Sequence, residues 1–111
     1  MSDGHATVSP APLDGLIDYQ GDSIVSRVLL KSPAGTVTLF AFDRGQELSE
    51  HTAPFDALVQ VLDGTAAITV GGTRHDVVAG HVIRLPGGIP HAVAATTRFR
   101  MLLTMIRAKS D

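Results

Sequence analysis

The chain has 111 residues, which corresponds to one domain, since domains typically contain about 100–150 residues. Its 9 basic and 11 acidic residues give a net charge of −2, which provides no electrostatic basis for binding nucleic acid or an anionic membrane. Without cysteine the chain forms no disulfide or thiolate metal site, and no apolar run approaches the ~20 residues of a membrane span. The N-terminus lacks the basic and apolar segments of a signal peptide, so we expect a soluble, cytoplasmic protein.

The first 20 residues are predicted to form an arm rather than part of the main domain. Residues 1–12 are small and polar, with Pro10 and Pro12, whereas residues 13–20 include apolar side chains suited to docking on the body of the protein. We therefore expect a partly ordered N-terminal arm over residues 1–20 and a single domain over residues 21–111.

The remainder of the chain is predicted to consist of β-strands. No segment has a helical 3.6-residue period of useful length, and turn residues separate short runs rich in β-branched and aromatic side chains. The pairs Asp63-Gly64 and Gly71-Gly72 are each predicted as a tight hairpin turn, because such residues tolerate positive φ. The predicted strands are residues 24–30, 36–42, 47–51, 58–62, 66–70, 73–78, 82–85, 91–95 and 99–106. This pattern is typical of an all-β antiparallel sandwich or barrel.

Two segments carry most of the functional information. The first has Gly45, five residues, His51, and then a six-residue interval from Ala57 to Gly64. The second has Gly80, five residues, Pro86-Gly-Gly88, two residues, and His91. The prolines of residues 86–90 donate no ladder hydrogen bonds, so this stretch is predicted to be a corner that places His91 at the start of an inward-facing strand.

These segments resemble the two signature motifs of the cupin family. The first family motif is Gly, five residues, His-x-His, three or four residues, Glu, six residues and Gly; the second is Gly, five residues, Pro-x-Gly, two residues, His, three residues and Asn. The resemblance covers about residues 36–106 and implies a single antiparallel β-barrel, or double-sheet jelly roll. The chain departs from the pattern at Ala53, Ala57 and Ala95, where the motifs have His, Glu and Asn.

The resemblance also implies where a metal would bind. In metal-binding cupins the two histidines and the glutamate of the first motif converge with the histidine of the second. This chain keeps only His51 and His91 of those four ligands, so the implied site is degenerate and suits at most one weakly bound divalent ion of Zn, Fe, Mn, Ni or Cu. Gln60 is the candidate third ligand, although it reaches the site only if a bulge reverses its strand face.

Two functions are left open. The first is a small-molecule-binding barrel, in which the alanines enlarge a cavity and His51 and His91 orient the ligand. Its apolar walls would come from Phe40, Phe42, Val59, Val61, Phe99, Met101 and Met105. The alternative is a metal-dependent cupin enzyme, dioxygenase-like or isomerase-like, that uses His51 and His91.

A homodimer is also expected. The composition is 44% apolar and only 18% charged, which leaves apolar surface to cover. The strand predicted at residues 24–30 has apolar side chains on both faces, as in a strand buried at an interface or between sheets. Small cupins pair as dimers, and the resemblance implies the same arrangement for this chain.

Overall fold

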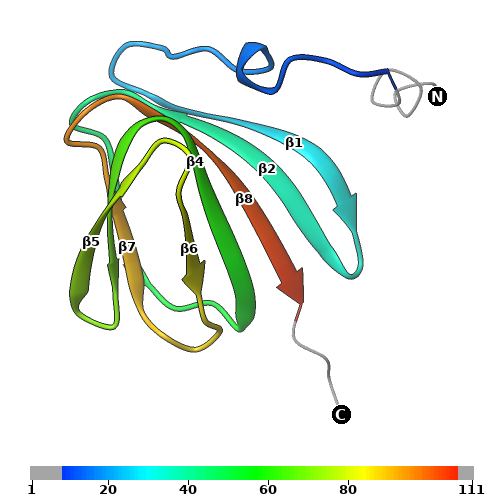
Figure 1. The fold of residues 1–111 in the computed structure, drawn as a ribbon. Coiled ribbons are helices and arrows are strands. Elements are labelled where there is room, and N and C mark those ends of the chain that lie inside the picture. The colour runs from blue at the N-terminus through cyan, green and yellow to red at the C-terminus, as the bar shows by residue number, and fades with distance from the viewer. Residues whose placement is uncertain (1–8, 108–111) are drawn as a thin grey trace.

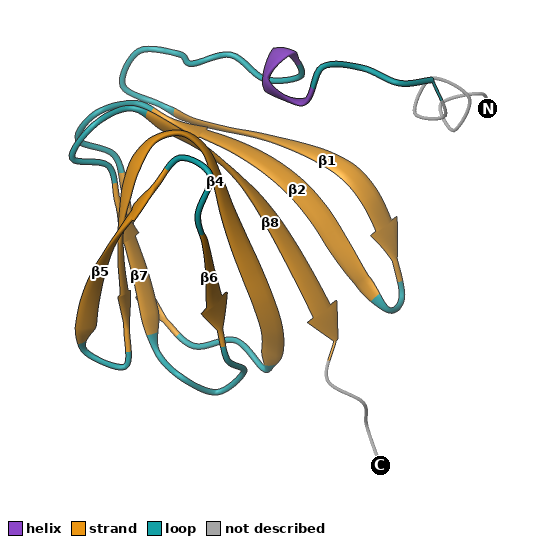
Figure 2. Cartoon of the chain, viewed as in Figure 1, coloured by secondary structure: helices purple, strands orange, loops and turns teal. Residues whose placement is uncertain are grey.

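A computed structural model describes residues 9–107, and β-strands form most of this part of the chain (Figures 1 and 2). The elements in chain order are η1 (Leu13–Gly15), β1 (Ile24–Ser32), β2 (Gly35–Phe42), β3 (Glu47–His51), β4 (Phe55–Val70), β5 (Thr73–Val78), β6 (Val82–Leu85), β7 (His91–Ala94) and β8 (Phe99–Arg107). Within residues 9–107 no helix is long and apolar enough to cross a membrane.

The strands form two antiparallel sheets that curl towards each other (Figure 1). Sheet A has the order β1-β2-β8-β4-β6, and sheet B has the order β5-β4-β7-β3. Strand β4 belongs to both, since residues 55–64 pair with β8 and residues 65–70 pair with β5. The predicted all-β, double-sheet barrel is confirmed.

The hairpin turn predicted at Asp63-Gly64 is wrong, because β4 runs through this pair without reversing. A register shift between Val61 and Asp63 bends the strand instead, where it passes from sheet A to sheet B. Gly64 has a φ of 74°, and a Cβ on it would overlap the carbonyl oxygen of Arg98 on the way into β8. Glycine is required here for a close approach of two chain segments. The hairpin turn predicted at Gly71-Gly72 is confirmed between β4 and β5.

The core lies between the two sheets, as the period-2 alternation of their strands requires. Phe42 of β2 and Phe99 of β8 are fully buried, and their rings stack with centroids 4.5 Å apart. Full burial of such a side chain contributes about 1.5–3 kcal/mol. The other buried members of this core are Val59, Val61, Ala66, Ile68, Val77, Leu85, Val93, Ala95 and Met101.

The N-terminal segment crosses the outer face of sheet A, at the end of the barrel that is uppermost in Figure 1. Ile17 is buried there against Leu39 and Ala41 of β2, so residues 13–20 dock on the barrel. The Tyr19 ring contacts the guanidinium groups of Arg98 and Arg100, whose carbons lie 5.2 and 4.7 Å from the ring centre. The first eight residues of the expected arm lie outside the described part of the chain.

Candidate functional site

The structure brings His51 and His91 together. His51 ends β3 and His91 begins β7, and the two residues are direct partners in the pairing of these strands. Their ring centroids lie 4.3 Å apart at an interplanar angle of 66°. His91 is half-buried and His51 is exposed, so the pair lies at the mouth of the barrel.

The corner at residues 86–90 is what delivers His91 to this point. Gly88 has a φ of +80°, and its N–H donates to the carbonyl oxygen of Ala53 at 2.8 Å. The N–H of Gly87 donates to Oδ1 of Asp56, also at 2.8 Å. The corner of the second motif is thereby attached to the segment that follows His51. Sequence reasoning missed this role of Asp56, because no spacing rule identifies a carboxylate that accepts from a distant backbone N–H.

A backbone hydrogen bond orients each histidine ring. Nδ1 of His51 lies 2.9 Å from the carbonyl oxygen of Ser49, and Nδ1 of His91 lies 3.4 Å from that of Ile89. Because a carbonyl oxygen only accepts, each Nδ1 carries a proton, and the tautomer that these hydrogen bonds select has its lone pair on Nε2. Among the described residues neither Nε2 has a hydrogen-bond partner.

Burial lowers the pKa of His91 below its ordinary value. The hydrogen bond to Ile89 opposes this shift, while the neighbouring His51 adds to it. His91 is therefore neutral at neutral pH, which keeps its Nε2 lone pair available.

A cavity of about 90 Å³ lies behind the two rings. Four of the predicted walls line it together with both histidines: Phe40, Val59, Met101 and Met105. The other three predicted walls do not line it and belong to the core between the sheets: Phe42, Val61 and Phe99. Since one water occupies roughly 30 Å³ in the liquid, this volume suits a few solvent molecules, an ion or a small organic group. Apart from the imidazoles the lining is apolar, including Phe55, whose ring lies 5.3 Å from the Arg107 guanidinium carbon.

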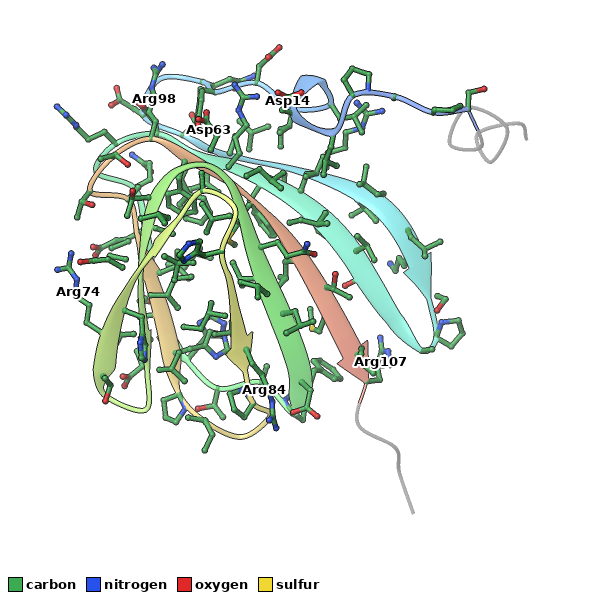
Figure 3. The ribbon with its side chains drawn as sticks, viewed as in Figure 1. Asp14, Asp63, Arg74, Arg84, Arg98 and Arg107 are labelled. Carbon is green, nitrogen blue, oxygen red and sulfur yellow. The ribbon has the colours of Figure 1, made fainter. Side chains whose placement is uncertain are left out.

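A larger depression of about 740 Å³ lies at the opposite end of the barrel, around Tyr19, Asp63 and Arg98. Figure 3 labels Asp63 and Arg98 at this end. Its charged groups pair with each other: Arg98 Nε lies 2.7 Å from Asp43 Oδ1, and this hydrogen bond lowers the pKa of the Asp43 carboxyl group. The Tyr19 hydroxyl donates to Asp63 Oδ2 at 2.7 Å. These contacts attach the N-terminal segment to the barrel, and we assign them a structural role.

The fold and the histidine pair agree with the comparison to known proteins. A family model described as the cupin domain matches residues 38–106. This chain belongs to the cupin family. A search of curated proteins finds no match.

Several solved structures resemble this cupin over most of its length. A conserved protein of unknown function from Streptococcus pyogenes is 34% identical, with a TM-score of 0.87, over 92% of this chain and 90% of its own. A cupin superfamily protein from Desulfitobacterium hafniense is 32% identical, with a TM-score of 0.85, over 90% of this chain and 92% of its own. A cupin 2 conserved barrel domain protein from Leptotrichia buccalis is 42% identical, with a TM-score of 0.82, over 86% of this chain but 46% of its own.

The four-ligand metal centre of metal-binding cupins does not fit the residues present. Ala53 and Ala57 line the cavity where a histidine and a glutamate would contribute ligands. In residues 9–107 no three His, Cys, Asp or Glu side chains cluster closely enough to hold a metal ion. Only the two imidazoles remain of the expected donor set.

The structure does not bring Gln60 to the site. Gln60 is exposed, its neighbours Val59 and Val61 are buried, and the β4–β8 register is continuous from Phe55 to Val61, so no bulge reverses its face. Five other side chains that could act as metal ligands are exposed and do not line the cavity: Glu47, Glu50, Asp56, His75 and His81. His5, in the expected arm, lies outside the described residues.

Proposed function

We propose that this cupin binds a small molecule in the cavity beside His51 and His91. One observation supports the proposal above all: two imidazoles, each with Nδ1 hydrogen-bonded to a backbone carbonyl and Nε2 free, lie at the mouth of a cavity that is otherwise apolar. An Nε2 lone pair accepts a hydrogen bond from a hydroxyl or acidic group of the ligand. The apolar wall contributes affinity by removing the rest of the ligand from water. The ligand class is thus a small, mostly apolar molecule with one donor group.

Thermal-shift measurements with a panel of short-chain carboxylic acids and phenols test this function. We expect ligands that raise the melting temperature of the wild type to lose this effect in His51→Ala. The matched control is His75→Ala, which removes an exposed histidine that does not line the cavity. A shift that survives in His51→Ala, or disappears equally in His75→Ala, would contradict the proposal.

A metal-dependent cupin enzyme is the second candidate. The hydrogen bonds from Nδ1 to backbone carbonyls favour it, because they fix the tautomer in which Nε2 coordinates a metal. The test is elemental analysis of the untagged protein, purified without chelator, beside His51→Ala. Near-stoichiometric metal that is lost in the variant would support this candidate, and metal-free wild-type protein would leave the small-molecule function as the proposal.

We also propose that the chain forms a homodimer and acts in the cytoplasm. The N-terminal segment covers only part of the outer face of sheet A. The rest of that face exposes four large apolar side chains: Leu30, Leu58, Val82 and Ile106. Contact with a second copy would remove them from water. The cysteine-free sequence is compatible with the reducing cytoplasm, and fractionation of cells tests this assignment.

A further inference from the structure

Besides the two imidazoles, the cavity is lined by a thioether, which is a less common metal ligand than histidine, aspartate or glutamate: that of Met105. Met105 of β8 lies directly opposite Ala57 of β4, and both residues line the cavity with His51 and His91. The Cβ atoms of directly opposed residues in antiparallel strands lie about 4.5–5.5 Å apart. The Met105 side chain therefore starts next to the position at which metal-binding cupins have their glutamate.

Met105 differs from the other methionine on the same strand face. Met101 is 2% exposed and belongs to the core between the sheets. Met105 is half-buried and is not packed in that core cluster. Its thioether is therefore less enclosed than that of Met101, and the three rotatable bonds of the side chain allow it to adjust to a partner in the cavity.

The charge of this donor set selects the ion. Two neutral imidazoles and one thioether contribute no negative charge, and no carboxylate lines the cavity. A divalent ion in this apolar setting would keep its full charge without compensation, which is costly. A monovalent ion has a smaller desolvation penalty, and soft thioether ligands with imidazole suit Cu(I).

We propose that the cavity binds one Cu(I) ion through Nε2 of His51, Nε2 of His91 and Sδ of Met105. The inference rests on the proposed function in one respect, that Nε2 of each imidazole is free to bind in the cavity, and it adds an ion and a third donor. It also accounts for Ala57, since a glutamate at that position would occupy the space next to the thioether and introduce a charge that favours divalent ions.

Anaerobic titration of the full chain with Cu(I), in competition with a chromophoric Cu(I) chelator, tests the site. We expect one Cu(I) per wild-type chain. Met105→Leu, which conserves volume, should weaken binding at least about tenfold, because replacing even an outer-shell partner typically costs 10–100-fold. The matched control Ile106→Leu changes the next residue of β8, which is exposed and does not line the cavity, and should change the affinity less than about twofold. X-ray absorption should show a sulfur ligand on copper that Met105→Leu removes.

The inference is overturned if Met105→Leu binds Cu(I) as tightly as the wild type, or if Ile106→Leu weakens Cu(I) binding as much as Met105→Leu does. It is also overturned if Zn(II) binds as tightly as Cu(I) and responds equally to Met105→Leu, because the thioether would then have no selective role. The thermal-shift assay on metal-free protein separates the two proposals. Ligand shifts that depend on His51 without any Cu(I) binding would leave the proposed function in place and refute only the copper site.

Discussion

Two alanines determine the chemistry of this cavity. Ala53 and Ala57 line it beside His51 and His91, at the positions where the cupin motif has a histidine and a glutamate. Methyl groups there leave the backbone of the barrel intact, while they remove one neutral and one anionic donor. Substitution at these two positions therefore changes the polar groups of the cavity without removing residues that hold the barrel together.

Restoring the two missing side chains should restore a divalent metal site. We expect Ala53→His/Ala57→Glu to bind Zn(II) or Ni(II) tightly, because four ligands then converge as in metal-binding cupins. Metal at 100 times its Kd should stabilise the variant by about 2.7 kcal/mol, measured as a rise in melting temperature. The control Ala92→His/Ala94→Glu places the same residues on the outer face of sheet B and should gain nothing. A folded double variant without metal affinity would refute this assignment of positions.

Asp56 is expected to stabilise the corner that carries His91. Asp56→Ala removes the acceptor of the Gly87 N–H and should lower the free energy of unfolding by about 1 kcal/mol in urea denaturation. The control is Asp76→Ala, which breaks only an exposed ion pair with Arg74 and should cost less, within about 0–1 kcal/mol. Equal losses in the two variants would mean that the corner does not depend on Asp56.

The sequence was sufficient to predict that His51 and His91 meet, because motif spacing and strand alternation determine which residues face the cavity. It was not sufficient for the hydrogen bonds of Nδ1 to Ser49 and Ile89, or for the bond from Gly87 to Asp56. Those contacts depend on where backbone groups lie after the corner has folded. Whether the histidines bind a ligand or a metal remains a prediction.

Among the elements, the N-terminal segment has the most specific attachment. Tyr19 hydrogen-bonds to Asp63 and contacts the guanidinium groups of Arg98 and Arg100. Burial raises the pKa of the Tyr19 hydroxyl to about 12, and the hydrogen bond and charge of Asp63 raise it as well, whereas Arg100 lowers it. The neutral phenol is thus the form that the docked segment favours.

This element provides a pH test with a built-in probe. Tyr19 is the only tyrosine and there is no tryptophan, so the ultraviolet absorbance of tyrosinate reports on Tyr19 alone. A raised pKa in the folded state means that the contribution of Tyr19 to stability is complete below pH 10 and is lost as the pH rises from 10 towards 12. We expect the titration midpoint near 12 in the wild type and lower in Asp63→Asn. A wild-type midpoint at the ordinary value would mean that the segment does not dock.

Strand β4 shows how far element prediction reaches. The two predicted strands at residues 58–62 and 66–70 are present, but Asp63-Gly64 joins them into one bent strand instead of reversing the chain. A glycine that permits close contact with a distant segment and a glycine that closes a hairpin have the same local sequence signature. Only the position of the Arg98 carbonyl distinguishes them, and that position depends on tertiary structure.

At the scale of the whole molecule, the fold class followed from strand alternation, whereas the proposed homodimer depends on a surface. The part of the outer face of sheet A that the N-terminal segment leaves uncovered includes Leu30 and Ile106, which are 63% and 58% exposed. Alternation predicts which residues point outward, but it does not distinguish an outer face that meets solvent from one that meets a second copy.

Light scattering after size-exclusion chromatography should give the wild-type protein a molecular mass twice the 11.6 kDa of one chain. Ile106→Asp places a charge in this uncovered part of the outer face of sheet A. We expect the variant to be a monomer with unchanged secondary structure. The matched control is Val78→Asp on β5, where a valine 41% exposed lies away from that face, and it should remain a dimer. A monomeric wild type would remove the basis of the proposal.

The order of strands in sheet A has a consequence for how the protein is made. Strand β8, the last of the described strands, lies between β2 and β4 and pairs with both over most of its length. During synthesis β2 and β4 leave the ribosome before β8. The edges that pair with β8 therefore remain without hydrogen-bond partners until residues 99–107 emerge. The barrel therefore closes only after β8 has been made, and until then the exposed edges of β2 and β4 make the nascent chain prone to aggregation.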